Sequence, residues 1–156
     1  MKYISIILIL FSVLLNFTLM AQNEDMWEMF SKVRIVDRMY MGSGKSGMMK
    51  HPYYTDEVKA LEGKTVEITG FLLPVSLTKC VVVVSRTPSS MCFFCGAGGM
   101  ETIVEVIPQD EDSKLKTLKL DTLLKIKGKL KLNKNDDPTH LIFIIEDAEL
   151  VEILDK

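Results

Sequence analysis

The chain has 156 residues, of which 47% are apolar and 26% are charged, and its formal net charge is −2 at pH 7. This length suits one domain with an apolar core of its own. So mild a charge balance gives no electrostatic reason to expect nucleic acid or an anionic membrane as the main partner. Three cysteines are too few for a scaffold held by disulfides, so we expect apolar packing to build the core.

Residues 1–21 have the features of a secretory signal peptide. Lys2 precedes an almost wholly apolar run over residues 3–20, and the small residue Ala21 stands before the polar Gln22. This order predicts cleavage after Ala21. An uncleaved membrane anchor is the alternative, because the apolar run is long enough to cross a bilayer. We therefore expect a periplasmic or otherwise exported protein that touches the membrane only through this segment, if it is uncleaved.

Residues 22–57 are expected to form an N-terminal helix and a loop. Apolar side chains recur near helical spacing, which predicts an amphipathic helix over residues 26–40. Gly42-Ser43-Gly44 would end this helix. The chain from there to about Tyr54 is expected to be a loop.

Residues 58–156 change to a period of two and are expected to form one β-barrel domain. Strands are predicted over residues 65–73, 79–85, 101–107, 122–132 and 140–151. Gly70 and Gly128 lie inside the first and the fourth strand, where a lone glycine often marks a bulge or a barrel corner. Five short strands that must hide their edges, with a short helix or long loop at 110–119, predict an OB-like barrel.

Several segments resemble small exported bacterial OB-fold proteins of unknown function. They are the run LEGKTVEITGFLLP, the valine-rich strand and cysteine-bearing loop that follow, and the runs LKIKGKLKLN and LIFIIEDAELVEI. The resemblance covers residues 58–154 and is sharpest from Gly63 to Pro74. It implies the fold and the compartment. It implies no ligand, because related families carry one cysteine in a proline-rich segment after the second strand, whereas this chain has Cys92 and Cys95.

Cys92 and Cys95 are the residues best suited to chemistry, and they lie in a long glycine-rich connection between the second and third predicted strands. Their spacing lets both sulfurs reach one metal ion, zinc or copper, or lets them reach each other. A small disulfide that stiffens the loop is the second hypothesis, and thiol exchange is the third. Haem attachment is excluded because Gly96, and not a histidine, follows Cys95.

A metal ion at Cys92 and Cys95 would need further ligands, because the chain has no second Cys-x-x-Cys. His51 is the preferred third ligand. His140 opens the last predicted strand, at the barrel end where Cys80 starts its own strand and away from the cysteine pair. Cys80 is expected to be a small apolar residue without a role in ligation.

Four methionines precede His51 in the sequence and form a candidate soft-ligand cluster with it: Met39, Met41, Met48 and Met49. Thioethers suit Cu(I). The favoured interpretation is nevertheless that these side chains pack the N-terminal loop onto the barrel, as methionines commonly do.

No catalytic arrangement stands out, and two histidines leave little room for acid–base chemistry, so we do not expect an enzyme. A strip of lysines is expected on the solvated face of the fourth strand: Lys125, Lys127, Lys129 and Lys131. Nucleic acid is not an expected partner, because the second and third predicted strands offer no aromatic side chains on which bases could stack. The sequence therefore predicts a non-enzymatic accessory protein that binds metal through Cys92, Cys95 and His51. The alternative is a chemically inert module of an envelope protein complex, with a structural Cys92–Cys95 disulfide.

Overall fold

The computed structural model describes residues 25–42, 45–76, 80–91, 94, 96, 98–110 and 113–154. The predicted signal peptide lies outside these ranges, as do Cys92 and Cys95. Among the described residues, we find no helix with the length and apolar character that a membrane span requires.

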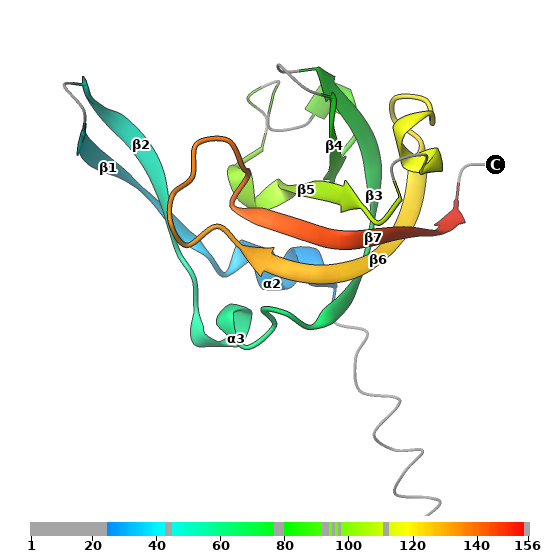
Figure 1. The fold of residues 1–156 in the computed structure, drawn as a ribbon, viewed down its shortest axis with the longest axis horizontal. Coiled ribbons are helices and arrows are strands. Elements are labelled where there is room, and N and C mark those ends of the chain that lie inside the picture. Colours follow the sequence, from blue (N-terminus) through cyan, green and yellow to red (C-terminus); the bar gives the residue numbers. More distant parts are fainter. Residues whose placement is uncertain are drawn as a thin grey trace, which may run out of the picture.

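Five strands close a mixed β-barrel in the spatial order β3-β4-β5-β7-β6 (Figure 1). They are β3 (Thr65–Ser76), β4 (Cys80–Ser85), β5 (Ile103–Pro108), β6 (Leu123–Leu132) and β7 (Phe143–Ile153). Neighbouring strands are antiparallel except β5 and β7, which are parallel, and β3 pairs with both β4 and β6. This is an OB-like connectivity, so the predicted fold class is confirmed.

Alternation of side chains builds the barrel, and β6 shows it most clearly. Leu124, Ile126, Leu130 and Leu132 are buried, while the lysines between them lie on the outer side. Glu146 and Asp147 lie at a bulge inside the continuous strand β7, where the pairing register with β6 shifts.

The two strand glycines occupy places where another chain segment comes close. A Cβ atom on Gly70 would lie 2.5 Å from the carbonyl oxygen of Ser85 in β4. A Cβ atom on Gly128 would lie 2.7 Å from the carbonyl oxygen of Glu146, at the bulge of β7. Glycine is needed at both positions because a side chain would push the neighbouring strand away.

The N-terminal segment differs from its prediction. The helix α2 covers only Met26–Ser31, and a hairpin of β1 (Arg34–Gly42) and β2 (Lys45–Tyr53) follows it. The prediction of a helix is therefore wrong for residues 34–40, and the prediction of a loop up to Tyr54 is wrong for β2. The β-branched side chains of Ile35 and Val36 favour an extended backbone, and pairing with β2 satisfies its hydrogen bonds.

Short helices close the apolar interior of the barrel. Phe30 in α2 is fully buried and stacks on Phe143 of β7, with 3.9 Å between the ring centroids. Trp27 donates a hydrogen bond from Nε1 to the carbonyl oxygen of Thr69, at 2.7 Å. A second helix, α3 (Asp56–Lys59), buries one valine, and the 3-10 turn η4 (Lys114–Lys116) buries one leucine, where a short helix or long loop was predicted.

Candidate functional site

The connection between β4 and β5, which carries Cys92 and Cys95, is closed at its base by backbone pairing. The N–H of Arg86 donates to the carbonyl oxygen of Thr102, at 2.9 Å. The buried Ser85 accepts the N–H of Thr87 on its Oγ, at 3.2 Å. Because the two cysteines lie outside the described residues, their metal or disulfide chemistry stays a prediction.

Asp121 clamps the first part of this connection. Its carboxylate accepts hydrogen bonds from the backbone N–H and the hydroxyl of Ser89, each at 2.6 Å. Ser89 begins the 3-10 turn η1 (Ser89–Met91), and the hydroxyl of Thr87 donates to the carbonyl oxygen of Met91, at 2.8 Å. The chain is therefore held as far as Met91, the residue before Cys92.

The returning part of the connection is anchored through a second 3-10 turn, η3 (Met100–Thr102). The N–H and the hydroxyl of Thr102 both donate to the carbonyl oxygen of Gly99, at 3.0 and 2.7 Å. The turn η3 also lies against α2, which itself packs on the barrel. Between these anchors, Gly96 adopts a φ of 76°, a conformation that favours glycine.

His51, the predicted third ligand, lies in β2 with its ring held by a carboxylate. Its Nδ1 is 2.6 Å from Oδ2 and 2.8 Å from Oδ1 of Asp136, in the connection between β6 and β7. Both side chains are mostly buried, and the ring of Tyr53 meets the imidazole edge-on. A carboxylate on one ring nitrogen commonly orients a metal-binding histidine. Nε2 is consequently the nitrogen through which His51 could reach a metal ion.

His140 forms the same kind of pair with another carboxylate. Its Nδ1 is 2.8 Å from Oε1 of Glu105, a buried residue of β5, and Oε2 of Glu105 accepts the N–H of Leu141 at 3.0 Å. Both histidines therefore tie the connection between β6 and β7 to other elements. Cys80 opens β4, as predicted. Whether His140 lies nearer to Cys80 than to the cysteine pair stays a prediction, because the pair is outside the described residues.

Three carboxylates of this region were missed by sequence reasoning: Glu105, Asp121 and Asp136. In the sequence, alternation predicts that the Glu105 side chain points to solvent. In the structure the connection between β6 and β7 covers it. Leu141 of that connection packs against a small cluster on β3, β4 and β5. Asp121 and Asp136 have positive φ angles of 63° and 54°. Aspartate tolerates this backbone conformation and is therefore common in turns. An aspartate at such a position predicts a turn, but it does not predict a hydrogen bond to a distant residue.

Within the described part of the chain, the histidine, cysteine, aspartate and glutamate side chains form no group of three that could hold a metal ion. A metal site on this protein therefore needs ligands from the cysteine-bearing connection or donors of another kind.

The lysine strip of β6 faces acidic residues on both neighbouring strands. Lys129 pairs with Asp147 at 2.9 Å and Lys131 with Glu146 at 2.6 Å. The hydrogen bond to Asp147 raises the pKa of Lys129. Lys127 stands opposite glutamates in β3 and β7. The strip is thus balanced by acids and does not form a continuous basic surface.

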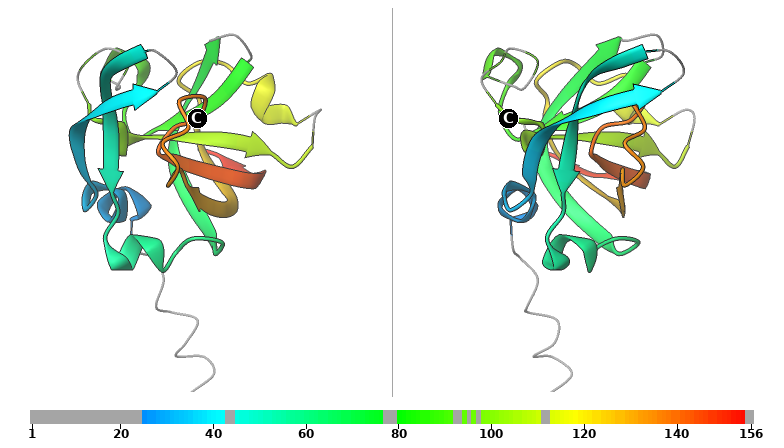
Figure 2. Two further views of the ribbon diagram at one scale, coloured as in Figure 1. Left: turned by 60° about the vertical axis from the view of Figure 1, so that its left-hand side comes forward. Right: turned by 90° about the vertical axis from the view of Figure 1, so that its left-hand side faces the viewer.

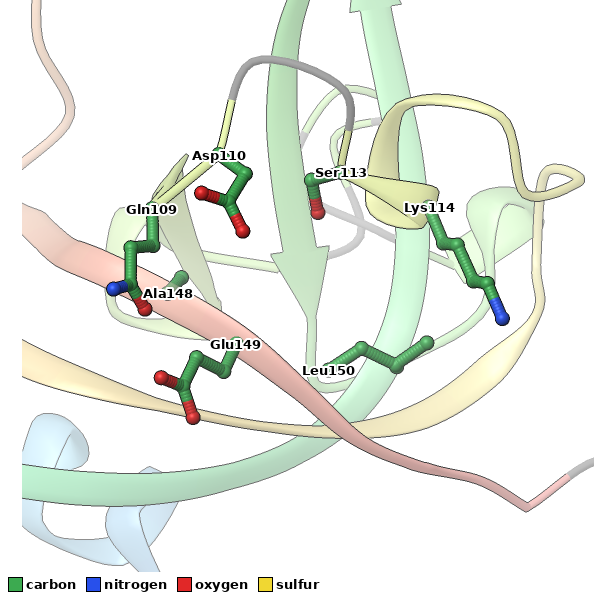
Figure 3. Close-up of a pocket in the computed structure, with 7 residues that line it drawn as sticks. All are labelled: Gln109, Asp110, Ser113, Lys114, Ala148, Glu149 and Leu150. Atoms are coloured by element: carbon green, nitrogen blue, oxygen red, sulfur yellow. The ribbon is translucent and has the colours of Figure 1, made fainter.

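An open pocket lies between β7 and the connection from β5 to β6 (Figure 3). Its lining residues are Gln109, Asp110, Ser113, Lys114, Ala148, Glu149 and Leu150. The N–H of Gln109 donates to the carbonyl oxygen of Ala148, at 3.1 Å, and this bond joins the two sides of the pocket. Its polar side chains carry both signs of charge, and none of the predicted site residues lines it.

Exposed apolar side chains mark two other regions. Met39 and Met48 of the hairpin are 67% and 64% exposed, so the prediction that they pack onto the barrel is wrong for these two. On the cysteine-bearing connection, Met91 and Phe94 are 59% and 45% exposed. Each pair offers exposed apolar contact area to a partner.

No family model, no curated protein and no solved structure matches this chain. The barrel is compatible with the predicted OB-like resemblance.

Proposed function

We propose that this protein is an exported, non-enzymatic accessory protein that binds a soft or borderline metal ion, Zn²⁺ or Cu(I), through Cys92 and Cys95. The anchoring of the connection as far as Met91 supports this proposal most directly. Hydrogen bonds at Asp121 and Thr87 order the backbone that leads into Cys92. An ordered flank lowers the entropy cost of bringing two thiolates to one ion.

His51 is the proposed third ligand, acting through Nε2. Asp136 holds Nδ1 and fixes the orientation of the ring, and such a carboxylate increases the basicity of a ligating imidazole. Asp136 is then a positioning residue. The compartment proposed is the periplasm, in keeping with a resemblance to small exported bacterial OB-fold proteins, and the mature chain is expected to begin at Gln22.

The test is the metal content and free-thiol count of protein purified without a metal-affinity tag. We expect stoichiometric metal, which Cys92→Ser with Cys95→Ser abolishes and the matched control Cys80→Ser retains. His51→Ala should weaken metal binding by more than about tenfold. Loss of a residue that only orients a ligand already costs about that much, and His51 is itself the proposed ligand. Reduced protein that binds neither Zn²⁺ nor Cu(I) more tightly than the double variant would contradict the proposal.

An inert interaction module of an envelope complex is the second candidate, and the exposed apolar side chains favour it. Met39 and Met48 give the hairpin an exposed apolar surface near its outer end, and Met91 and Phe94 give the cysteine-bearing connection another. A Cys92–Cys95 disulfide in the untreated protein, together with an absence of bound metal, would make this candidate the better one.

A further inference from the structure

The hairpin of β1 and β2 extends from the side of the barrel, with α2 and α3 near its base (Figures 1 and 2). Near its outer end, Met39 and Met48 are direct cross-strand partners. They are more exposed than any other large apolar side chain whose burial the structure describes. Methionine is usually buried, so packing does not explain why these two stand opposite each other in solvent.

We propose that Met39 and Met48 form a thioether site for a soft monovalent cation, Cu(I), separate from the cysteine pair. Side chains of directly opposed strand residues have Cβ atoms about 4.5–5.5 Å apart. Methionine has three rotatable bonds beyond the backbone, so both sulfurs can turn toward one point. A sulfur-to-metal distance of about 2.3 Å requires two sulfurs within roughly 4.6 Å of each other, which this spacing permits.

The neighbouring residues on the same side of the hairpin favour a soft ion over a hard one. Asp37 and Lys50 form the cross-strand pair two positions nearer the barrel, and their ion pair measures 2.7 Å. The Asp37 carboxylate is therefore neutralised and not left to attract a divalent cation. Uncharged thioethers select Cu(I) and its analogue Ag(I), whereas Mg²⁺ and Ca²⁺ require oxygen ligands.

His51 does not belong to this site, although it is close to Met48 in the sequence. In the pairing register His51 stands opposite Val36, whereas Met48 stands opposite Met39. Successive side chains of a strand point to opposite faces, so an odd separation places His51 and Met48 on different faces. The His51–Asp136 pair instead ties the hairpin to the barrel domain and holds the backbone that presents the two methionines.

The test uses Ag(I), a redox-stable probe for a Cu(I) site, on the full chain with Cys80, Cys92 and Cys95 changed to Ser. In ¹³C-methyl spectra we expect the Met39 and Met48 resonances to shift together at one equivalent. Met39→Leu with Met48→Leu keeps the apolar surface and removes both sulfurs, so affinity should fall by more than about tenfold. The matched control is Met91→Leu, which replaces an exposed methionine of another element and should leave the affinity unchanged.

Equal Ag(I) affinity in the double leucine variant and its parent would overturn this site. If the serine variant does not fold, the unsubstituted protein serves, because its methionine methyl signals report on this site after the thiols are saturated. The absence of a shift at Met39 and Met48 there would also overturn it. Each result is independent of the metal proposed for Cys92 and Cys95, since that test compares protein with and without these two cysteines, whereas this one reads methionine methyl groups.

Discussion

The barrel and the β1–β2 hairpin are both built from paired strands, but they are stabilised in different ways. Each barrel strand pairs with a neighbour on both sides, whereas β1 and β2 form a sheet of two strands. The barrel buries alternate side chains, while the hairpin exposes Met39, Met48 and Tyr53. An isolated pair of strands is marginal in water. The hairpin consequently depends on a few anchors near its base.

These anchors are specific and come from distant parts of the chain. His51 meets Asp136, and Tyr54, which follows β2 directly, donates a hydrogen bond from its hydroxyl to the carbonyl oxygen of Ile142. Ile35 packs on the edge of the main core. The barrel should therefore carry the global stability, whereas the outer end of the hairpin is free to carry a function.

The largest expected difference in stability is between a variant of a core aromatic residue and a variant of an exposed hairpin residue. Phe30→Ala removes a fully buried ring that stacks on Phe143, and should lower the free energy of unfolding by about 3–5 kcal/mol. Met39→Ala should change it by less than about 0.5 kcal/mol, because that side chain is exposed. Urea denaturation of both variants measures the difference. If both variants lost similar amounts of unfolding free energy, the hairpin would contribute to the core, contrary to this expectation.

A matched pair of glycine substitutions sharpens the same contrast. An alanine at Gly70 in β3 would place its Cβ 2.5 Å from a backbone oxygen of β4, and should cost about 1–3 kcal/mol. Gly47 in β2 has no atom within 4 Å of the position of a Cβ. Gly47→Ala should therefore leave stability unchanged or raise it by up to about 1 kcal/mol. Thermal unfolding that ranks the two variants the other way would be inconsistent with this fold.

The sequence was sufficient for the barrel because burial there follows the period of the strands. In β6 buried residues alternate with outward lysines, and this alternation is visible in the sequence alone. In and just before β1, the apolar residues Val33, Val36 and Tyr40 fit a helical spacing as well. Because neither face of the hairpin is fully buried, no clean alternation reveals it. Its anchors join residues 85 and 88 positions apart, which local patterns cannot detect.

The candidate site was predictable only in its residue types. Cys-x-x-Cys and a histidine indicate metal chemistry by their donor atoms, and His51 does sit beside an orienting carboxylate. The prediction that His51 and Met48 belong to one ligand cluster was wrong, because it assumed that residues close in the sequence are also close in space. Both residues lie in β2 three positions apart, so their side chains point to opposite faces of the hairpin. The clamp at Asp121 was invisible because Ser89 lies 32 positions away.

The smallest expected effect tests the joint between the two regions. Tyr54→Phe keeps the buried ring and removes the hydrogen bond of 2.7 Å to the carbonyl oxygen of Ile142. That oxygen also accepts the N–H of Asn133, so the loss near neutral pH should be about 1 kcal/mol or less. Burial, together with the charge of Asp136, raises the pKa of the Tyr54 hydroxyl. In the unfolded chain the same group ionises near pH 10.

The sign of the pH dependence follows from this difference. The native state keeps the Tyr54 proton at a pH where the unfolded state releases it, so the contribution of the group is complete below about pH 10 and declines above it. Tyr54→Phe has no such proton to lose. The stability difference between wild type and variant should therefore shrink, and then reverse, between about pH 8 and about pH 11. Urea denaturation at both ends of this range measures it, and ionisations common to both proteins cancel in the difference. A constant difference would show that Tyr54 titrates equally in the folded and unfolded states, and that its hydroxyl is not buried at the joint.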